Sequence, residues 1–519
     1  MGSKVKLGSL LSLLTDYHAN GAYKKLKENV ELFDEPDYAV MIRTTNFEQN
    51  NFDSNLKYIS EHAYNFLEKS KVKAGDIIMN KIANAGSSYL MPELNCPVSL
   101  AMNLFLLRID DDKANSTFVY LYLKLNEDYV KSFANGSVTK TITKEAVRNL
   151  EIELPERTMQ DYIVKVYMDY VSKLTLNQKT NQTLEQMAQA LFKSWFVDFD
   201  PVFDNLLASV DFKLDNLESR LPDELKQKAQ RRLVALNSLE NATQCKASLI
   251  ALAHELQAQT QAAEQVSEKA AETPVKANLN ANPKILTQHA NTHAHFPNEF
   301  EHNEQLGWIP KGWEEGTFKD IADGLSGYAF KGKDFSETGF AVLKIKNITT
   351  DRSVAINDVN RVSPEVIDKL QRFLLNDGDI IMAMTGATVG KFGVLVSEDN
   401  EAYYLNQRVC KLTPKMEKGN PFLFSALNQP GVEEGILSAA QGSAQPNISA
   451  NGILATKLLV PSKKTIEIFN RLLEDIYERK ITLRKECYKL TKLRDTLLPK
   501  LISGELQIPD VVTDEEIVD

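Results

Sequence analysis

The chain has 519 residues, so at roughly 150 residues per domain it holds several structural units, and a single small domain is excluded. Hydrophobic residues make up 43% and charged residues 25%, values that are ordinary for globular proteins and exclude wholesale disorder. Much of the net charge of −10 lies in residues 198–304, with 16 acidic and 10 basic residues, and in residues 505–519, with 6 acidic and no basic ones. The rest is near neutral, so the overall acidity does not exclude a nucleic-acid partner.

No run approaches the roughly 18 apolar residues of a membrane span, and residues 1–14 do not have the pattern of a signal peptide. The cysteines are far apart, which favours neither a disulfide framework nor a thiolate zinc site: Cys96, Cys245, Cys410 and Cys487. We therefore expect a cytoplasmic protein with reduced thiols.

Residues 1–155 have the pattern of a compact α/β domain. Short β-branched and apolar runs alternate with Gly, Asn and Asp turns, as in Gly-Asp-Ile-Ile-Met at residues 75–79. An apolar strand closed by Pro155 ends the segment.

Residues 156–200 are expected to form the first long helix. Residues 158–197 contain neither glycine nor proline, and apolar side chains recur at a spacing of three and four. Asn177 and Asn181 lie on the same stripe, and we interpret them as polar residues that set the register of a partner helix. About forty residues make a rod of roughly 60 Å, although the stripe packing on its own domain is the alternative. We expect Pro201 to end this helix.

Residues 201–305 are expected to be a connector, helical over 221–256 and then an exposed Ala/Gln/Asn-rich linker over 274–303. Five of the seven histidines fall here: His254, His289, His293, His295 and His302. We predict no metal site, because a metal needs ligands on an ordered scaffold.

Residues 306–461 repeat the first domain at a spacing of about 300 residues. Gly-Asp-Ile-Ile-Met recurs at 378–382, an earlier strand at 38–41 matches 340–343, and a later Gly-Ser pair at 136 and 137 matches 442 and 443. Because the matches occur in the same order, they indicate an internal duplication.

A second long helix is expected over 462–503, followed by an acidic tail at 504–519. The predicted fold is therefore α+β. It consists of two globular α/β domains separated by two long antiparallel coiled-coil helices, related by a pseudo-two-fold internal duplication.

Three segments resemble catalytic motifs, but each lacks a residue or an arrangement that the chemistry requires. Residues 386–391 resemble a phosphate-binding loop but are one residue short, and Phe392 stands where a hydroxyl should bind magnesium. The acidic pair after Pro222 is read as the start of a helix, since nuclease carboxylates come from separate strands. Residues 200–203 lack the second proline of an amino-methyltransferase loop. We predict a binding protein with no catalytic residues.

Two further segments carry a resemblance to a known family. Residues 191–202, Leu-Phe-Lys-Ser-Trp-Phe-Val-Asp-Phe-Asp-Pro-Val, resemble the central conserved region of specificity (S) subunits of type I restriction-modification enzymes. Residues 306–313, Leu-Gly-Trp-Ile-Pro-Lys-Gly-Trp, resemble the segment that opens their second target recognition domain. With the repeat and the two helices, the likeness covers nearly the whole chain. The Ala/Gln/Asn-rich stretch before Leu306 departs from the family's usual layout.

The resemblance implies a non-catalytic subunit that reads a split site on double-stranded DNA through two target recognition domains. Partner subunits then act on that DNA: modification subunits, expected as two copies, methylate adenine, and restriction subunits translocate and cleave it. S-adenosylmethionine, ATP and magnesium are expected on those partners and no cofactor on this chain. The loops after the repeated motif differ, at 80–86 and 383–391, so we expect an asymmetric target.

Polar loop residues are the candidate DNA contacts, because amide and basic side chains can pair with base edges while lysines and hydroxyls can hold phosphates. In the first domain they are Arg43, Thr44, Asn46, Asn80, Lys81, Asn84, Thr139 and Lys140. In the second domain they are Tyr328, Lys331, Lys333, Lys344, Lys346, Asn347, Thr385, Thr388, Lys391, Gln441, Ser443, Gln445 and Asn447.

The alternative function is a scaffold in which the helices join two protein-binding domains and DNA is never touched. Salt dependence separates the two hypotheses, because several phosphate contacts make affinity fall steeply with salt.

Overall fold

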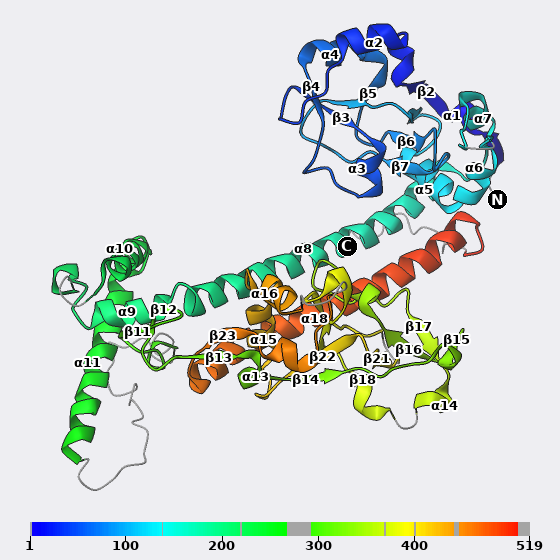
Figure 1. Cartoon of the computed structure of the whole chain (residues 1–519). Helices are drawn as coiled ribbons and strands as arrows, with labels where there is room; N and C mark the ends of the chain where they lie inside the picture. The colour runs from blue at the N-terminus through cyan, green and yellow to red at the C-terminus, as the bar shows by residue number, and fades with distance from the viewer. Residues whose placement is uncertain are drawn as a thin grey trace, which may run out of the picture. The chain divides into compact units, whose positions relative to one another are not determined.

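A computed structural model describes residues 3–136, 139–217, 221–266, 292–367, 370–398, 401–440 and 446–506. The chain divides into two compact units (Figure 1). Unit 1 contains residues 1–175 and 489–519, and unit 2 contains residues 176–488. Among the described helices, none combines the length and the apolar character needed to cross a membrane.

Unit 1 contains the first α/β domain, built on two four-stranded sheets. The strand orders are β2-β9-β6-β7 and β4-β3-β8-β5, and β1 pairs antiparallel with β10. The strands are β1 (Ser3–Lys6), β2 (Leu11–Asp16), β3 (Ala39–Ile42), β4 (Tyr58–Ile59), β5 (Lys71–Val72), β6 (Ile77–Asn80), β7 (Ser88–Leu90), β8 (Val98–Leu100), β9 (Leu104–Ile109) and β10 (Glu151–Leu154). The helices are α1 (Leu7–Leu10), α2 (Tyr23–Asn29), α3 (Thr44–Glu48), α4 (Glu61–Phe66), α5 (Ser116–Leu125), α6 (Glu127–Ser132) and α7 (Lys144–Asn149), with 3₁₀ turns η1 (Tyr17–Asn20) and η2 (Glu68–Ser70).

Unit 2 contains the second α/β domain, which repeats these sheets in the orders β14-β22-β19-β20 and β17-β16-β21-β18, with β15 added at the edge of the second sheet. Its strands are β13 (Glu314–Thr317), β14 (Ala322–Ser326), β15 (Phe335–Ser336), β16 (Phe340–Leu343), β17 (Asn360–Val362), β18 (Leu374–Leu375), β19 (Ile380–Ala383), β20 (Phe392–Val394), β21 (Tyr403–Leu405), β22 (Val409–Pro414) and β23 (Lys457–Val460). Its helices are α13 (Phe318–Ile321), α14 (Pro364–Ile367), α15 (Asn420–Leu427), α16 (Val432–Ala439) and α17 (Ala450–Leu454), with 3₁₀ turns η5 (Gly332–Asp334), η6 (Ile345–Asn347), η7 (Gln371–Phe373) and η8 (Gly386–Thr388).

The repeated Gly-Asp-Ile-Ile-Met motif forms the same turn and central strand in both domains. Gly75 and Gly378 have φ angles of +81° and +82°, which a residue with a Cβ rarely adopts. The following aspartates each accept a hydrogen bond at 2.7 Å from the backbone N–H three residues earlier. The three apolar residues of each copy are fully buried in β6 and β19. The motif was therefore recognisable because it specifies a turn and a core strand.

Shared local contacts extend the duplication along the chain. The N–H of Ile142 donates to Lys81 O at 3.0 Å, and the N–H of Ile448 donates to Met384 O at 2.9 Å. Thr143 caps α7 and Ser449 caps α17. These contacts, together with the identical strand orders, confirm the predicted α+β fold with two similar domains.

One predicted alignment within the repeat is shifted by one residue. The sequence match places Tyr38 against Phe340, whereas the strands themselves begin at Ala39 and Phe340. Both strands then end four residues before a buried asparagine, Asn46 or Asn347. Residues that share a backbone role are therefore 301 apart at this place, and not 302.

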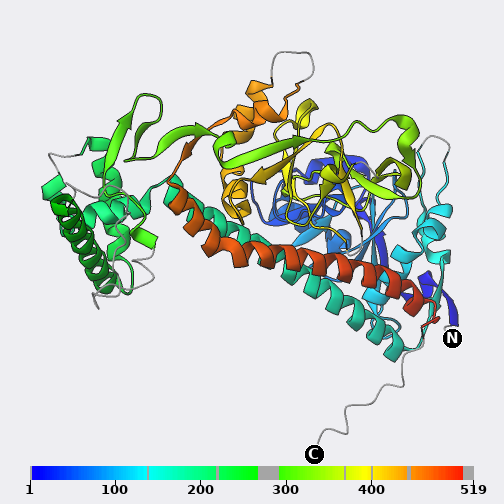
Figure 2. The same cartoon turned by 90° about the horizontal axis from the view of Figure 1, so that it is seen from below.

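The two long helices are α8 (Arg157–Phe196) and α18 (Lys463–Ile502), each 40 residues long, and each passes from one unit into the other (Figure 2). Within unit 2 their contacts run in opposite directions along the chain. Asn177 donates to Glu486 at 3.0 Å, Glu185 pairs with Lys480, and the Phe192 ring lies 5.7 Å from that of Phe469. The helices are therefore antiparallel, as predicted. Asn177 is buried in the seam, whereas Asn181 keeps a buried Oδ1 without a partner.

Each long helix is also fastened to an α/β domain by a buried amide. In unit 1 the Oε1 of Gln160 accepts a hydrogen bond from Asn115 N at 2.8 Å, at the start of α5. In unit 2 the Oδ1 of Asn470 accepts one from Phe422 N at 2.9 Å, at the start of α15. The N-terminal N–H groups of a helix lack partners within that helix, so these amides satisfy one of them.

The connector continues in unit 2 as α9 (Asp200–Ala208), η3 (Leu214–Leu217), α10 (Asp223–Asn237) and α11 (Ala242–Val266), and a hairpin of β11 (Phe300–Asn303) and β12 (Gly307–Pro310) follows. We expected Pro201 to end the first long helix, and this prediction is wrong. Pro201 lies in the first turn of α9. The chain turns instead at Phe199, which has a φ angle of +62°. Of the expected linker at 274–303, the part up to residue 291 lies outside the described residues, as does the tail from residue 507.

A buried charged cluster joins the two ends of the connector. Asp204 is 2% exposed and accepts hydrogen bonds from Arg232 at 2.7 and 2.8 Å and from His293 at 3.0 Å. Burial alone would raise the pKa of Asp204, but the hydrogen bonds from Arg232 and His293 outweigh it and lower that pKa. Asn205 also donates to the carbonyl oxygens of His293 and Phe296. These polar contacts bind residues 293–296 to α9.

Candidate nucleic-acid interface

The candidate DNA contacts of each domain divide into two groups, one on each sheet. In the first domain, Lys81 and Asn84 follow β6, and Thr139 and Lys140 lie in a neighbouring loop. Bridges from Thr141 to Ile82 and Asn135 bring this loop against the one that follows β6. The structure thus gathers residues that are about 55 positions apart in the sequence.

The matching group of the second domain lies after β19. Thr385, Thr388 and Lys391 are half-buried in the loop, and a bridge from Thr385 to Asn447 brings exposed Asn447 beside them. The N–H of Gly386 donates to Pro446 O at 2.9 Å, which closes the same contact. Gln441, Ser443 and Gln445 lie outside the described residues.

The second group lies at the ends of β3 and β16. Arg43 and Thr44 are half-buried at the start of α3. In the second domain, Lys344 lies 4.0 Å from the centroid of the Phe335 ring, and the rings of Phe335, Phe330 and Tyr328 follow one another at 6.2 and 5.0 Å. The other lysines of this group are exposed: Lys331, Lys333 and Lys346.

Three asparagines among the candidates face the interior, so the prediction of accessible loop residues is wrong for them. Asn46 is 4% exposed, and its amide bonds to Arg43 N and Asn51 O. Asn347 is 2% exposed and bonds to Lys344 N, Ala355 O and Asp358 O. Asn80 is 1% exposed in β6, where its Nδ2 donates to the Tyr89 hydroxyl at 3.4 Å. The first two stabilise the backbone that presents other candidates.

Lys81 is half-buried and is already paired with a carboxylate, which it shares with a second lysine. Its Nζ lies 3.1 Å from Asp16 Oδ2, and Lys144, which sequence reasoning missed, reaches Asp16 Oδ1 at 2.9 Å. Burial would raise the pKa of Asp16, but the hydrogen bonds from Lys144 and Lys81 outweigh it and hold that pKa below its ordinary value. Lys144 directly follows the loop of Thr139 and Lys140. This proximity in the sequence could have identified Lys144 as a candidate.

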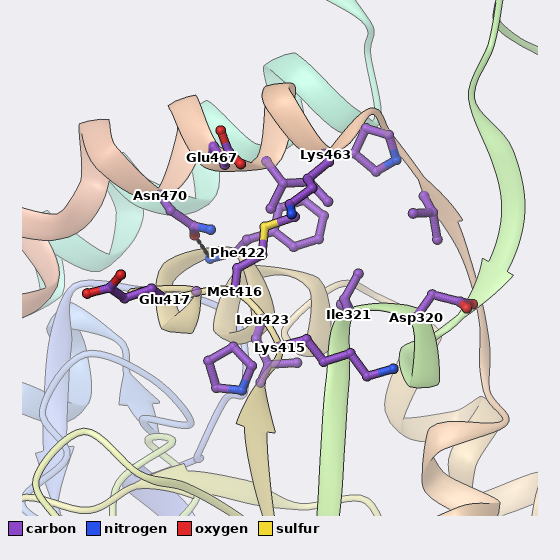
Figure 3. Close-up of a pocket in the computed structure, with 15 residues that line it drawn as sticks. Asp320, Ile321, Lys415, Met416, Glu417, Phe422, Leu423, Lys463, Glu467 and Asn470 are labelled. Atoms are coloured by element: carbon purple, nitrogen blue, oxygen red, sulfur yellow. Dashed lines mark hydrogen bonds between the residues drawn. The ribbon is translucent and has the colours of Figure 1, made fainter.

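A cavity in unit 2 is lined by residues outside these loops. It has a volume of about 640 Å³ and is bounded by α13, the segment after β22, α15 and the start of α18, as Figure 3 shows. Phe422, Leu423 and Ile466 supply apolar walls, while Lys463 and Glu467 add charge. None of the candidate DNA contacts lines it. The cavity belongs to the junction between the domain and the long helix.

The two segments that carried the family resemblance meet in one aromatic cluster. Trp195 and Phe196, at the end of α8, lie 5.6 and 5.1 Å from the ring of Phe469 in α18. Phe196 also lies 5.9 Å from Trp313, and Phe199 lies 5.7 Å from it. Aromatic pairs at these separations add stabilisation beyond the area they bury. These residues therefore join the first helix, the second helix and the start of the second domain.

Comparison with known proteins assigns the duplicated architecture. The family model "Type I restriction modification DNA specificity domain" matches this chain twice, over residues 4–186 and 310–490. The chain belongs to this family. Both matches contain one α/β domain and most of a long helix, so the family unit coincides with the internal repeat.

The chain is also similar to individual proteins. The type I restriction enzyme HindI specificity subunit of Haemophilus influenzae is 27% identical over 460 residues, covering 84% of this chain and 88% of its own. The type I restriction enzyme MjaIX specificity subunit of Methanocaldococcus jannaschii is 20% identical over 408 residues, covering 78% and 72%. A crystal structure of a type I restriction-modification S subunit from M. genitalium covers 96% of each chain, with 15% identity and a TM-score of 0.47.

Proposed function

We propose that this chain is the DNA-reading subunit of a type I restriction-modification complex and that it recognises an asymmetric, bipartite target. The observation that supports this most directly is the pair of domains with one framework and two different sets of loops. A shared framework suits two readers of the same polymer, and different loops suit two different half-sites.

The catalytic steps then belong to partner subunits. Modification subunits, expected as two copies, would bind S-adenosylmethionine and methylate adenine, and restriction subunits would use ATP and magnesium to translocate and cleave DNA. This chain would supply base recognition and the placement of those subunits on the duplex. Two segments that resemble enzyme motifs support this division. Gly386–Thr388, within the segment that resembles a phosphate-binding loop, is a 3₁₀ turn, and the acidic pair after Pro222, which resembles a nuclease motif, starts α10.

Reconstitution tests the proposal. The purified chain is mixed with a type I modification subunit from the same organism, and methyl transfer to duplex DNA is measured for the mixture and for each protein alone. We expect transfer at a defined sequence only in the mixture, with affinity that falls steeply as salt rises. Methyl transfer by this chain alone, or a mixture that methylates without sequence preference, would refute the proposal.

A further inference from the structure

Arg43 and Lys344 occupy the same position in the two domains. Each follows the last residue of its strand, β3 or β16, and each donates its backbone N–H to the Oδ1 of the buried asparagine three residues later, at 3.0 and 2.9 Å. Asn46 and Asn347 thus fix the same backbone geometry in both copies. A basic side chain leaves the framework at this point in each domain.

Neither cation is matched by a carboxylate within the described part of the chain. The Nη2 of Arg43 donates to Asn55 O at 2.9 Å, whereas its Nε is buried without an acceptor. Lys344 lies over the Phe335 ring, and burial together with the nearby charge of Lys346 lowers its pKa. By contrast, Lys346 pairs with Asp358 at 2.7 Å.

A partly desolvated charge without a counter-charge is unfavourable unless a ligand supplies negative oxygen atoms. Candidates on the other sheet differ between the domains: Lys81 has Met384 as its counterpart and Asn80 has Ala383. A positive charge at this one position is nevertheless present in both. Two half-sites of different sequence have the same phosphate backbone but different bases. A charged residue present in both domains should therefore contact phosphates, which both half-sites have.

We propose that Arg43 and Lys344 are equivalent phosphate contacts, each holding the DNA backbone of the half-site that its own domain reads. The inference rests on the proposed function, because it takes DNA as the ligand. Both arginine and lysine can serve at such a position, since a phosphate accepts hydrogen bonds from either a guanidinium or an ammonium group.

The test measures binding of the reconstituted complex with modification subunits to cognate and non-cognate duplexes across a range of salt concentrations. R43A and K344A should each weaken binding to both duplexes by a similar factor, about 3-fold to 10-fold. Each should also reduce the slope of log affinity against log salt by about 1, while the methylated sequence stays the same. Lys113→Ala and Lys311→Ala are matched controls, because each removes an exposed lysine already paired with a carboxylate and should leave the slope unchanged.

The charge-preserving variants R43K and K344R keep the test decisive if an alanine variant does not fold. Retained affinity and slope support a phosphate contact. A changed base preference in any of the four variants would overturn the proposal in favour of base reading, and unchanged affinity in both alanine variants would overturn it altogether. If the wild-type complex shows no sequence preference, the proposed function fails, but a reduced slope in the variants still supports the phosphate contacts.

Discussion

The two recognition domains differ most clearly where their central strands meet the loops. In the first domain, Asp16 at the end of β2 pairs with Lys81 directly after β6. In the second domain the corresponding residues are Ser326 and Met384, and the Ser326 hydroxyl lies 3.7 Å from the Met384 sulfur. Equivalent backbone positions thus carry an ion pair in the first domain and a contact between two uncharged side chains in the second. The framework is retained while the chemistry of the loop edge changes, which is what two readers of different sequences require.

The loop after the central strand should determine which half-site a domain reads. Replacing residues 385–391 with the residues after β6 of the first domain removes Thr385, Thr388 and Lys391 from the second reader. We expect recognition of the second half-site to be lost or changed, with the first half-site intact. The methylated motif in cells that carry the variant measures this. A change in both half-sites at once would contradict the claim that each domain reads its own half-site.

The long helices should determine the number of base pairs between the half-sites. Seven residues inserted into α8 and α18 at matched levels, near Asn177 and Glu486, keep the apolar stripes in phase and lengthen both helices by about 10 Å. We expect the spacer to grow by about three base pairs, because the duplex rises about 3.4 Å per base pair. An active variant with an unchanged spacer would contradict a role of these helices in setting it.

The buried asparagines should stabilise both domains to different extents. Asn347→Ala leaves three backbone groups without partners and Asn46→Ala leaves two, so we expect losses of about 3 and about 2 kcal/mol in unfolding free energy. Denaturant unfolding followed by hydrogen exchange assigns each loss to its domain. Equal, negligible losses would show that these amides do not hold the loops.

The smallest effect is expected from the ion pair that distinguishes the first domain. Because the folded-state pKa of Asp16 is lowered, its contribution to stability is present at neutral pH and is lost as pH falls below about 4 through that folded pKa. Asp16→Asn should therefore cost about 1 kcal/mol at pH 7, and the difference from wild type should shrink in acid. Ser326→Ala, the matched change in the second domain, should show no such pH dependence. If Asp16→Asn lowered the unfolding free energy equally at every pH, the ion pair would not be the cause of the loss.

The repeat, the long helices and the sheet motif were predictable from the sequence because each rests on a local pattern. Gly-Asp-Ile-Ile-Met specifies a turn and a buried strand, and the apolar stripes specify helices with a partner. Asn46 and Asn347 were misplaced because a polar residue after a strand resembles an exposed loop residue, while its burial depends on backbone groups of other loops. Pro201 was misread because proline is as well suited to the first turn of a helix as to the end of one.

The candidate interface was predictable only as a set of loops. Sequence proximity could not show that Lys81 pairs with Asp16 or that Asn447 lies beside Thr385, since both contacts join distant segments. Nor could it single out Arg43 and Lys344, whose equivalence appears only when the strands are aligned by their hydrogen bonds.

Methylome sequencing of host cells with and without this chain tests the central claim most directly. If two different readers recognise two half-sites, an asymmetric methyl-adenine motif interrupted by a fixed number of unspecified base pairs should disappear when the chain is deleted. A methylome that does not change, or the loss of a single uninterrupted motif, would contradict the account.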